Sequence, residues 1–228
     1  MTLLPPQLAA AILLATLACN TSQAPAAAGS IPSGWTWVAT VPTPSARIAV
    51  VGDSLTWQAE HGSTSTSDPY YQRHALTDQL NAEGWAARIA ARSGADTRSL
   101  SMWGGWQSAP DVIVMALGSN DRRYAPPTFP FQLGTSQWNV VPYLKHWPGA
   151  CVVLVGIVET APRGLNVYGP AWNRWLRYLA DLKGWVFVDW ATISAGHPDW
   201  FTSDLLHHTT AGQQAYRMAL IEGVQRCR

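Results

Sequence analysis

Two long, uninterrupted runs of apolar residues constrain the fold of this chain more than any other feature of its sequence. Residues 111–117 read DVIVMAL, and residues 151–158 read CVVLVGIV. Apolar runs of this length that are rich in β-branched residues are typical of strands buried on both faces. Such strands occur almost only in parallel sheets that carry helices on both sides. We therefore expect a parallel sheet between two helical layers.

Three shorter segments complete the predicted sheet. They alternate with helical patterns, as the strands of a parallel sheet do when helices form the crossovers. The predicted fold is an α/β three-layer α/β/α sandwich with a five-stranded parallel sheet. The additional strands are 47–51, 85–90 and 185–188.

The helices are predicted from their end signals and their apolar periodicity. The first helix is predicted to begin after Asp68, its N-cap, with Pro69 as the first helical residue, and to end at Gly84. Between positions 170 and 184, apolar residues recur at i, i+3, i+4 and i+7, which indicates an amphipathic helix whose tryptophans pack in the core. A capping-box pattern, Thr210 followed by Gln213, opens the last helix.

Length and charge limit the class of protein. A chain of 228 residues supports one sizeable core. The formal charge of +1 offers no electrostatic basis for binding nucleic acid or an anionic membrane surface. Charged residues make up 13% and apolar residues 47%, which favours a globular body. We expect a monomer.

The N-terminus resembles an export signal. Residues 1–24 contain an apolar stretch that is too short, and too interrupted by Pro5 and Pro6, to span a membrane comfortably. Ser22 and Ala24 supply small residues at the −3 and −1 positions of a predicted cleavage site for secretion. In the alternative, Cys19 is the lipidated residue of a bacterial lipoprotein; in a third interpretation the N-terminus is unprocessed and cytosolic. Residues 25–46 are predicted to form a Pro/Ala/Ser-rich linker or arm, and 47–228 the catalytic domain.

The remaining cysteines fit an exported protein. Cys151 begins a strand at one edge of the sheet, and the last helix should end near Cys227 at the same edge. A disulfide between them would close a loop of about 75 residues and stabilise the domain by on the order of 4 kcal/mol. Two unrelated thiols are the alternative.

Three short polar blocks follow the predicted strands and contain the parts of an acyl-transfer site. They contribute Ser54 as nucleophile, Asn120 as amide donor, and Asp204 with His207 as a carboxylate–imidazole pair. Gly94 follows the second strand and, with the backbone of Ser54 and the Asn120 amide, can form an oxyanion hole. All of these groups fall at the carboxyl edge of a parallel sheet, where sites form in such folds.

Other roles for the same residues stay open. His208 is a rival base, one position after His207, and Asp53 is expected to brace the turn before the serine. Asp53, Asp204 and His207 could instead bind a metal in a metal-dependent hydrolase. The chain contains no Gly-x-Ser-x-Gly, so the nucleophile elbow of the α/β-hydrolases is missing.

The combination of blocks resembles the SGNH hydrolases, also called GDSL esterases/lipases. Gly52-Asp53-Ser54-Leu55, Gly94, Gly118-Ser119-Asn120-Asp121 and Asp204–His207 match the family's four blocks in order, across roughly residues 47–216. The resemblance implies a flavodoxin-like three-layer fold, hydrolysis of ester or O-acyl bonds, and neither metal nor cofactor. It assigns Ser54, Asp204 and His207 to catalysis, and Ser54, Gly94 and Asn120 to the oxyanion hole.

The substrate is less constrained by the sequence. Trp57, Trp103 and Trp106 are placed to line a substrate pocket, with core packing as the alternative. Arg122 and Arg123 could meet an anionic substrate or form a solvated pair. The segments 57–67, expected to be a polar loop, and 124–139 contain no long apolar lid, so we expect short acyl groups, such as acetyl esters of small molecules or polysaccharides.

The leading hypothesis is therefore a secreted serine esterase. A non-catalytic carbohydrate-binding or surface protein on the same fold is the alternative from another class, and its tryptophans would then be stacking platforms. An acyltransferase is a third hypothesis, because water and a sugar hydroxyl compete for the same acyl-enzyme.

Overall fold

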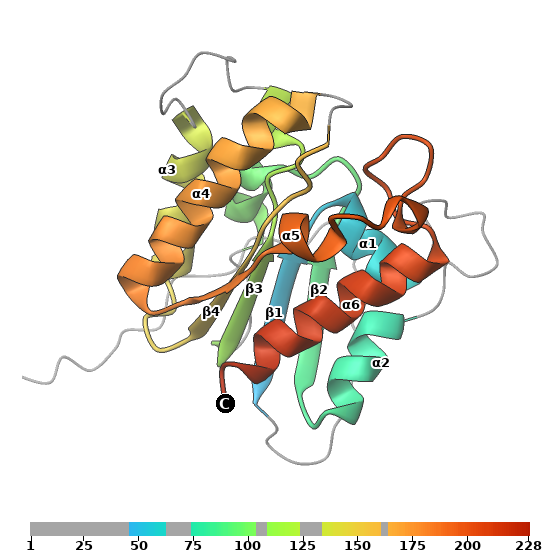
Figure 1. Cartoon of the computed structure of the whole chain (residues 1–228). Helices are drawn as coiled ribbons and strands as arrows, with labels where there is room; N and C mark the ends of the chain where they lie inside the picture. The colour runs from blue at the N-terminus through green and yellow to red at the C-terminus, as the bar shows by residue number, and fades with distance from the viewer. Residues whose placement is uncertain (1–45, 63–73, 104–108, 124–133, 161–163) are drawn as a thin grey trace, which may run out of the picture.

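The computed structural model describes residues 46–62, 74–103, 109–123, 134–160 and 164–228 (Figure 1). Residues 1–45 are outside this part, so the predicted export signal and linker stay predictions. Figure 1 shows one central sheet with helices on both sides. The strands are β1 Arg47–Gly52, β2 Ala86–Ala91, β3 Val112–Ala116, β4 Cys151–Val155 and β5 Val186–Val188.

The sheet is parallel throughout and has the order β2-β1-β3-β4-β5. Its middle strands β3 and β4 are almost completely buried, because every residue from Val112 to Ala116 and from Val152 to Val155 is apolar and covered on both faces. Each of the five predicted strands is present, within a few residues of its predicted bounds. The predicted α/β fold is confirmed.

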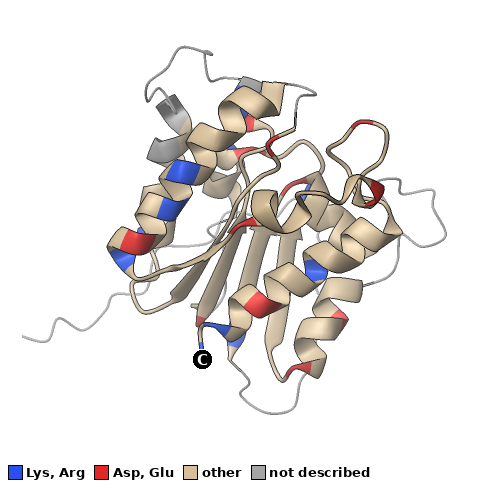
Figure 2. Cartoon of the chain, viewed as in Figure 1, with Lys and Arg blue, Asp and Glu red and all other residues tan. Residues whose placement is uncertain are grey.

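Two helical layers cover the sheet. Helices α1, α2 and α6 lie on one face and α3 and α4 on the other (Figure 1). Charged side chains lie mainly on these helices and on the loops, whereas β3 and β4 carry none (Figure 2). The helices are α1 Ser54–His61, α2 Ala75–Ala82, α3 Gly134–Lys145, α4 Leu165–Lys183, α5 Trp190–Ser194 and α6 Thr210–Gln225.

Helix α1 corrects the prediction that residues 57–67 form a polar loop. Leu55 and Ala59, four positions apart, are buried against the core. Polar neighbours such as Gln58 and Glu60 are buried as well, which their residue types did not indicate. The polar composition therefore concealed a helix, and residues 63–67 lie outside the described part.

Several helix ends differ from their predicted positions. The N-cap of α6 is Thr209, whose hydroxyl accepts a hydrogen bond from Gly212 N–H at 3.3 Å, and Thr210 is the first helical residue. Helix α4 begins at Leu165, before the predicted start at Pro170, and α3 was not predicted. The predicted N-cap Asp68 lies outside the described residues.

The disulfide predicted from topology is present. Cys151 and Cys227 are bonded, with their Cα atoms 5.9 Å apart. The bond joins the start of β4 to the residues after α6, at the sheet edge opposite the carboxyl ends of the strands. Among the described residues, no helix combines the length and apolarity needed to cross a membrane.

Candidate active site

Ser54 is the first residue of α1 and directly follows the turn that leaves β1. Asp53 caps the helix by accepting a hydrogen bond from Leu55 N–H at 2.9 Å, which confirms that it braces this turn. Gly52 is required by close approach, because a Cβ there would lie 2.1 Å from Oγ1 of Thr56. Ser54 occupies the first helical position, where a backbone N–H has no partner within the helix. This N–H can therefore donate to a negatively charged group that binds at the start of the helix.

The structure brings Ser54 and His207 together although 153 positions separate them in the chain. Ser54 Oγ and His207 Nε2 are 3.0 Å apart, within hydrogen-bond distance. The serine side chain is largely buried, and the imidazole is partly exposed. This is the distance that a general base requires to take a proton from a serine hydroxyl.

Asp204 holds the other side of the imidazole. Its Oδ2 lies 2.6 Å from His207 Nδ1, and its Oδ1 accepts hydrogen bonds from His207 N–H and Leu206 N–H at 2.9 and 3.1 Å. The Thr202 hydroxyl donates to the same oxygen at 2.8 Å. Burial by itself would raise the pKa of the Asp204 carboxyl, but these hydrogen bonds outweigh it and hold the pKa well below its usual range. The carboxylate is therefore ionised beside the histidine.

The turn that carries Asp204 and His207 is closed by its own backbone. Leu205 N–H donates to the Thr202 carbonyl at 2.9 Å, and Thr202 N–H donates to the His207 carbonyl at 2.8 Å. Leu205 has φ +51°, in the left-handed region, which is unusual for a residue with a side chain. The Thr160 hydroxyl donates to the Leu205 carbonyl at 2.9 Å and ties the turn to the segment after β4.

His208 does not compete with His207 for the serine. Its ring is 2% exposed and packs among Trp190, Phe201 and Tyr216, with ring centroids 5.2, 5.6 and 5.0 Å away. Neither ring nitrogen has a hydrogen-bond partner among the described residues. Burial, helped by the nearby His207, lowers the pKa of His208 to about 3, so this imidazole is neutral. The structure places the ring of His207, and not that of His208, beside the Ser54 hydroxyl.

Gln58 is a residue of this region that sequence reasoning missed. It lies one helical turn after Ser54, and its Oε1 accepts a hydrogen bond from His208 N–H at 3.1 Å. Both groups are buried. The contact connects the helix that begins with the serine to the backbone beside His207. No sequence signal could have found it, because position 58 was expected in a loop.

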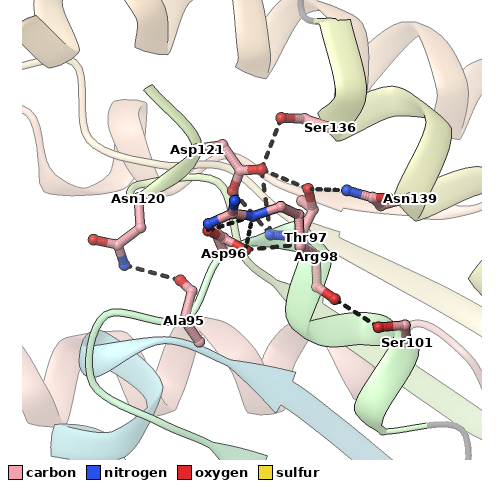
Figure 3. Close-up of polar contacts among 9 residues, drawn as sticks. All are labelled: Ala95, Asp96, Thr97, Arg98, Ser101, Asn120, Asp121, Ser136 and Asn139. Carbon is pink, nitrogen blue, oxygen red and sulfur yellow. Dashed lines mark hydrogen bonds and ion pairs between the residues drawn. The ribbon is translucent and has the colours of Figure 1, made fainter. Parts of the chain in front are cut away.

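Asn120 and Gly94 come from neighbouring loops. The Asn120 side-chain amide donates one hydrogen bond to the Ala95 carbonyl at 2.9 Å (Figure 3). Since an amide NH₂ has two hydrogens, the second stays available for another acceptor. Gly94 precedes Ala95 in a turn after β2 and has φ +76°, a conformation that favours glycine.

Asp121 fixes the loop that carries Asn120. Its carboxylate accepts hydrogen bonds from the N–H and hydroxyl of Thr97 and from the Ser136 hydroxyl, which lies 2.7 Å away (Figure 3). Burial raises the pKa of Asp121 despite these donors. The residue belongs to the same block as Asn120 but received no role from the sequence. Its burial and its partners assign it a positioning role in the Asn120 loop.

The metal alternative finds little support in the contacts of its three residues. Both ring nitrogens of His207 are engaged, one with Ser54 and one with Asp204. Asp53 is buried and caps α1. In the described ranges, no group of three or more His, Cys, Asp or Glu side chains is arranged to hold a metal ion. The arrangement fits proton transfer through the imidazole better than ligation.

Trp103 was predicted to line a substrate pocket, with core packing as the alternative. It is 5% exposed and belongs to the hydrophobic core, which favours the core-packing alternative, and its place in a substrate pocket stays a prediction. Trp57 is half-buried and packs on His61, with ring centroids 4.2 Å apart. Arg122 is half-buried too. Trp106 and the side chain of Arg123 lie outside the described residues, as does segment 124–133.

The chain combines a parallel α/β/α fold with a serine, a histidine and an aspartate that are joined by hydrogen bonds at the carboxyl edge of the sheet. This is the architecture of a serine hydrolase. The chain belongs to the GDSL-like lipase/acylhydrolase family, whose sequence profile matches residues 50–215. This confirms the resemblance drawn from the Ser54, Asn120 and His207 blocks and makes the protein an ester hydrolase. No curated protein sequence matches the chain.

Solved structures with the same fold include a phospholipase and an esterase. Phospholipase A1 from Streptomyces albidoflavus NA297 has a TM-score of 0.61 and 18% identity, with 78% of this chain and 99% of that one covered. A mutant of Axe2, an acetylxylan esterase from Geobacillus stearothermophilus, has a TM-score of 0.59 and 16% identity, covering 81% and 95%. The structure of TesA has a TM-score of 0.59 and 22% identity, covering 80% and 99%. At these identities the likeness establishes the fold.

Proposed function

We propose that the protein is a secreted serine esterase in which Ser54 is the nucleophile, His207 the general base and Asp204 the residue that orients it. One observation carries this proposal: an unbroken chain of hydrogen bonds runs from Ser54 Oγ through His207 to Asp204. A pure binding module has no need for a base 3.0 Å from a serine hydroxyl at a helix start. The contact therefore favours catalysis over the carbohydrate-binding alternative.

In the proposed acylation step, Ser54 Oγ attacks the carbonyl carbon of the ester while His207 Nε2 accepts the hydroxyl proton. The carbonyl oxygen becomes an oxyanion, and the N–H groups of Ser54 and Gly94 with the Asn120 amide donate to it. Asp204 accepts from Nδ1–H and stabilises the imidazolium. The C–O bond to the alcohol then breaks, and His207 returns its proton to the departing alcohol oxygen.

The second half of the cycle regenerates the serine. A water molecule attacks the acyl-Ser54 carbonyl, and His207 takes its proton. The bond to Oγ breaks, the carboxylic acid leaves, and the proton passes from His207 back to Ser54. A sugar hydroxyl in place of water would give acyl transfer instead of hydrolysis.

We propose short acyl groups, with acetyl esters of carbohydrates as the preferred class. The basis is the absence of a long apolar lid from the sequence of residues 57–67 and 124–139. Proteins of the same fold include an acetylxylan esterase and an extracellular lipase from Streptomyces rimosus, so the fold leaves this choice open. Export is proposed from residues 1–24 and from the disulfide, with Cys19 lipidation as the envelope-anchored variant.

The test combines substrate range with removal of the nucleophile. The wild-type protein should hydrolyse p-nitrophenyl acetate faster than longer-chain esters, and Ser54→Ala should lower kcat by about 10⁴-fold or more. A fluorophosphonate probe should label the wild type and not the variant. Ser101→Ala is the control, because this serine is exposed, donates its hydroxyl to the Arg98 carbonyl and has no part in the proposed mechanism. Near-normal esterase activity in Ser54→Ala would refute the assignment of the nucleophile.

A further inference from the structure

A cleft of about 810 Å³ opens beside the proposed catalytic turn, and the mechanism above makes no use of it. It lies between α4 and α5 and is bounded by the segment after β4 and by the residues after α5. Its volume is in the range of small-molecule and cofactor sites. Leu205, between Asp204 and His207 in the chain, lines it, so the cleft reaches the turn that holds the proposed base.

The full charges of the described residues that line the cleft balance. Arg177 and Asp189, both in the lining, form an ion pair with each other. The other two full charges in the lining are Glu159, which accepts a hydrogen bond from Asn173 at 2.9 Å, and Arg174. Within the described part of the lining, two carboxylates and two guanidiniums cancel, so these residues give no net electrostatic preference to an anion or a cation. A neutral ligand fits it best.

The cleft combines apolar surface with exposed hydrogen-bonding groups. Phe201, Pro170 and Leu205 supply the apolar surface. Arg174 is exposed and, within the described residues, makes no hydrogen bond or ion pair, so its five N–H donors are available. Thr160 and the carboxylate of Glu159 add acceptors at the end nearest the catalytic turn. Sugars match this combination, because their rings have apolar C–H faces and their edges carry hydroxyls that both donate and accept.

We propose that this cleft binds a neutral oligosaccharide chain, as the carbohydrate part of a polysaccharide ester whose acyl group reacts at Ser54. The proposal rests on the esterase function proposed above and specifies its alcohol side. Sugar units seated between α4 and α5 would hold a polymer along the rim, with Leu205 between them and the reacting ester. Binding energy from the chain would then raise kcat/KM for polymeric esters relative to small ones.

The first experiment measures binding without catalysis. Ser54→Ala is titrated calorimetrically with xylohexaose, cellohexaose and chitohexaose, three neutral oligosaccharides that carry no O-acetyl ester. At least one should bind, and the affinity should fall at least tenfold when Ala195→Trp or Arg174→Ala is added. Ala195 is exposed and lines the cleft, so a tryptophan there would fill it. Ala82→Trp and Lys183→Ala are the matched controls, since both are exposed helical residues outside the cleft, and they should leave the affinity unchanged.

The second experiment measures hydrolysis with Ser54 intact. Two values of kcat/KM are measured for each protein: one on the O-acetylated form of the polymer identified in the titration, and one on p-nitrophenyl acetate. The first value divided by the second should fall at least tenfold in both cleft variants and in neither control. No binding by any of the three oligosaccharides, or an unchanged ratio in both variants, overturns the cleft proposal. Inactivity of the wild type on every ester refutes the esterase function instead, and the binding titration then decides the cleft separately.

Discussion

Two turns at the carboxyl edge of the sheet supply the proposed catalytic groups, and they are held in place in different ways. The nucleophile turn, residues 52–56, is short and buried and is fixed by its neighbours in the chain. The histidine turn, residues 202–208, is partly exposed and is tied to the rest of the molecule by contacts with distant residues. Thr160 holds the Leu205 carbonyl, and Gln58 holds His208 N–H.

The difference shows which catalytic group is more easily displaced. Ser54 has β1 before it and α1 after it, so its position follows from backbone geometry. The position of His207 depends on the hydrogen bonds of one side chain, Asp204, and on the backbone bond from Thr202 N–H to the His207 carbonyl. Substitutions around the histidine turn should therefore impair catalysis while the fold persists, whereas changes in the nucleophile turn should act on stability as well.

Asp204→Asn should have the largest effect on the histidine turn. The asparagine oxygen can keep the bonds that Oδ1 accepts, but an NH₂ in place of Oδ2 cannot accept from His207 Nδ1–H. The imidazole would then take the wrong tautomer, and kcat should fall by about 10³- to 10⁴-fold. Steady-state kinetics and thermal unfolding together test this. Asp199→Asn, an exposed acid near the turn, is the control, and equal losses in both variants would contradict the assigned role.

His208→Phe should make the protein more resistant to acid. The unfolded chain protonates this histidine below about pH 6.5, whereas burial keeps it neutral in the fold down to about pH 3. The wild type should therefore lose about 2 kcal/mol of unfolding free energy from this group between pH 7 and pH 5. Phenylalanine fits the aromatic surroundings and removes that loss. Urea unfolding at the two pH values measures it, and an equal drop in both proteins would refute the buried neutral state.

Asp53→Asn should also change how the free energy of unfolding depends on pH. The contribution of Asp53 has the opposite sign to that of His208. Burial raises the pKa of Asp53 to about 6, although the Leu55 N–H and the nearby Ser119 hydroxyl lower it. The fold therefore retains a proton that the unfolded chain releases near pH 4, so stability from this group falls as pH rises from 5 to 7, by roughly 1 kcal/mol. Asparagine can still cap α1 and does not ionise. Unfolding free energies of both proteins, compared over this range, test the sign.

Gln58→Leu should give the smallest effect, a fall in kcat of about tenfold with KM nearly unchanged. Leucine preserves the volume on α1 but removes the acceptor of His208 N–H, so the histidine turn loses one of its ties to the nucleophile helix. The rate of fluorophosphonate labelling should fall in parallel. Gln225→Leu, an exposed residue near the C-terminus, is the control. A change confined to KM would show that Gln58 acts on the substrate rather than on His207.

The strands were predictable because a buried parallel strand is apolar along its whole length, as residues 112–116 illustrate. Helix α1 was not predictable, because Gln58 and Glu60 are residue types that normally lie on the surface. Both are buried here because distant groups satisfy them. Gln58 accepts from His208 N–H, and Glu60 is bonded to His74 and Thr77. Trp103 shows the converse limit of the sequence, because a tryptophan near a site motif packs as well in the core, where Trp103 is buried, as in a pocket.

The sequence by itself determined the order of the strands along the chain, the fold class, and the residue types that could perform acyl transfer. It did so because apolar periodicity and short polar blocks after strands are local properties. Only the tertiary structure placed His207, and not His208, within hydrogen-bond distance of Ser54, assigned Gln58 and Asp121 their partners, and revealed the cleft beside Leu205. These depend on which side chains from distant positions meet, and that is set by the packing of whole helices on the sheet rather than by neighbours in the chain.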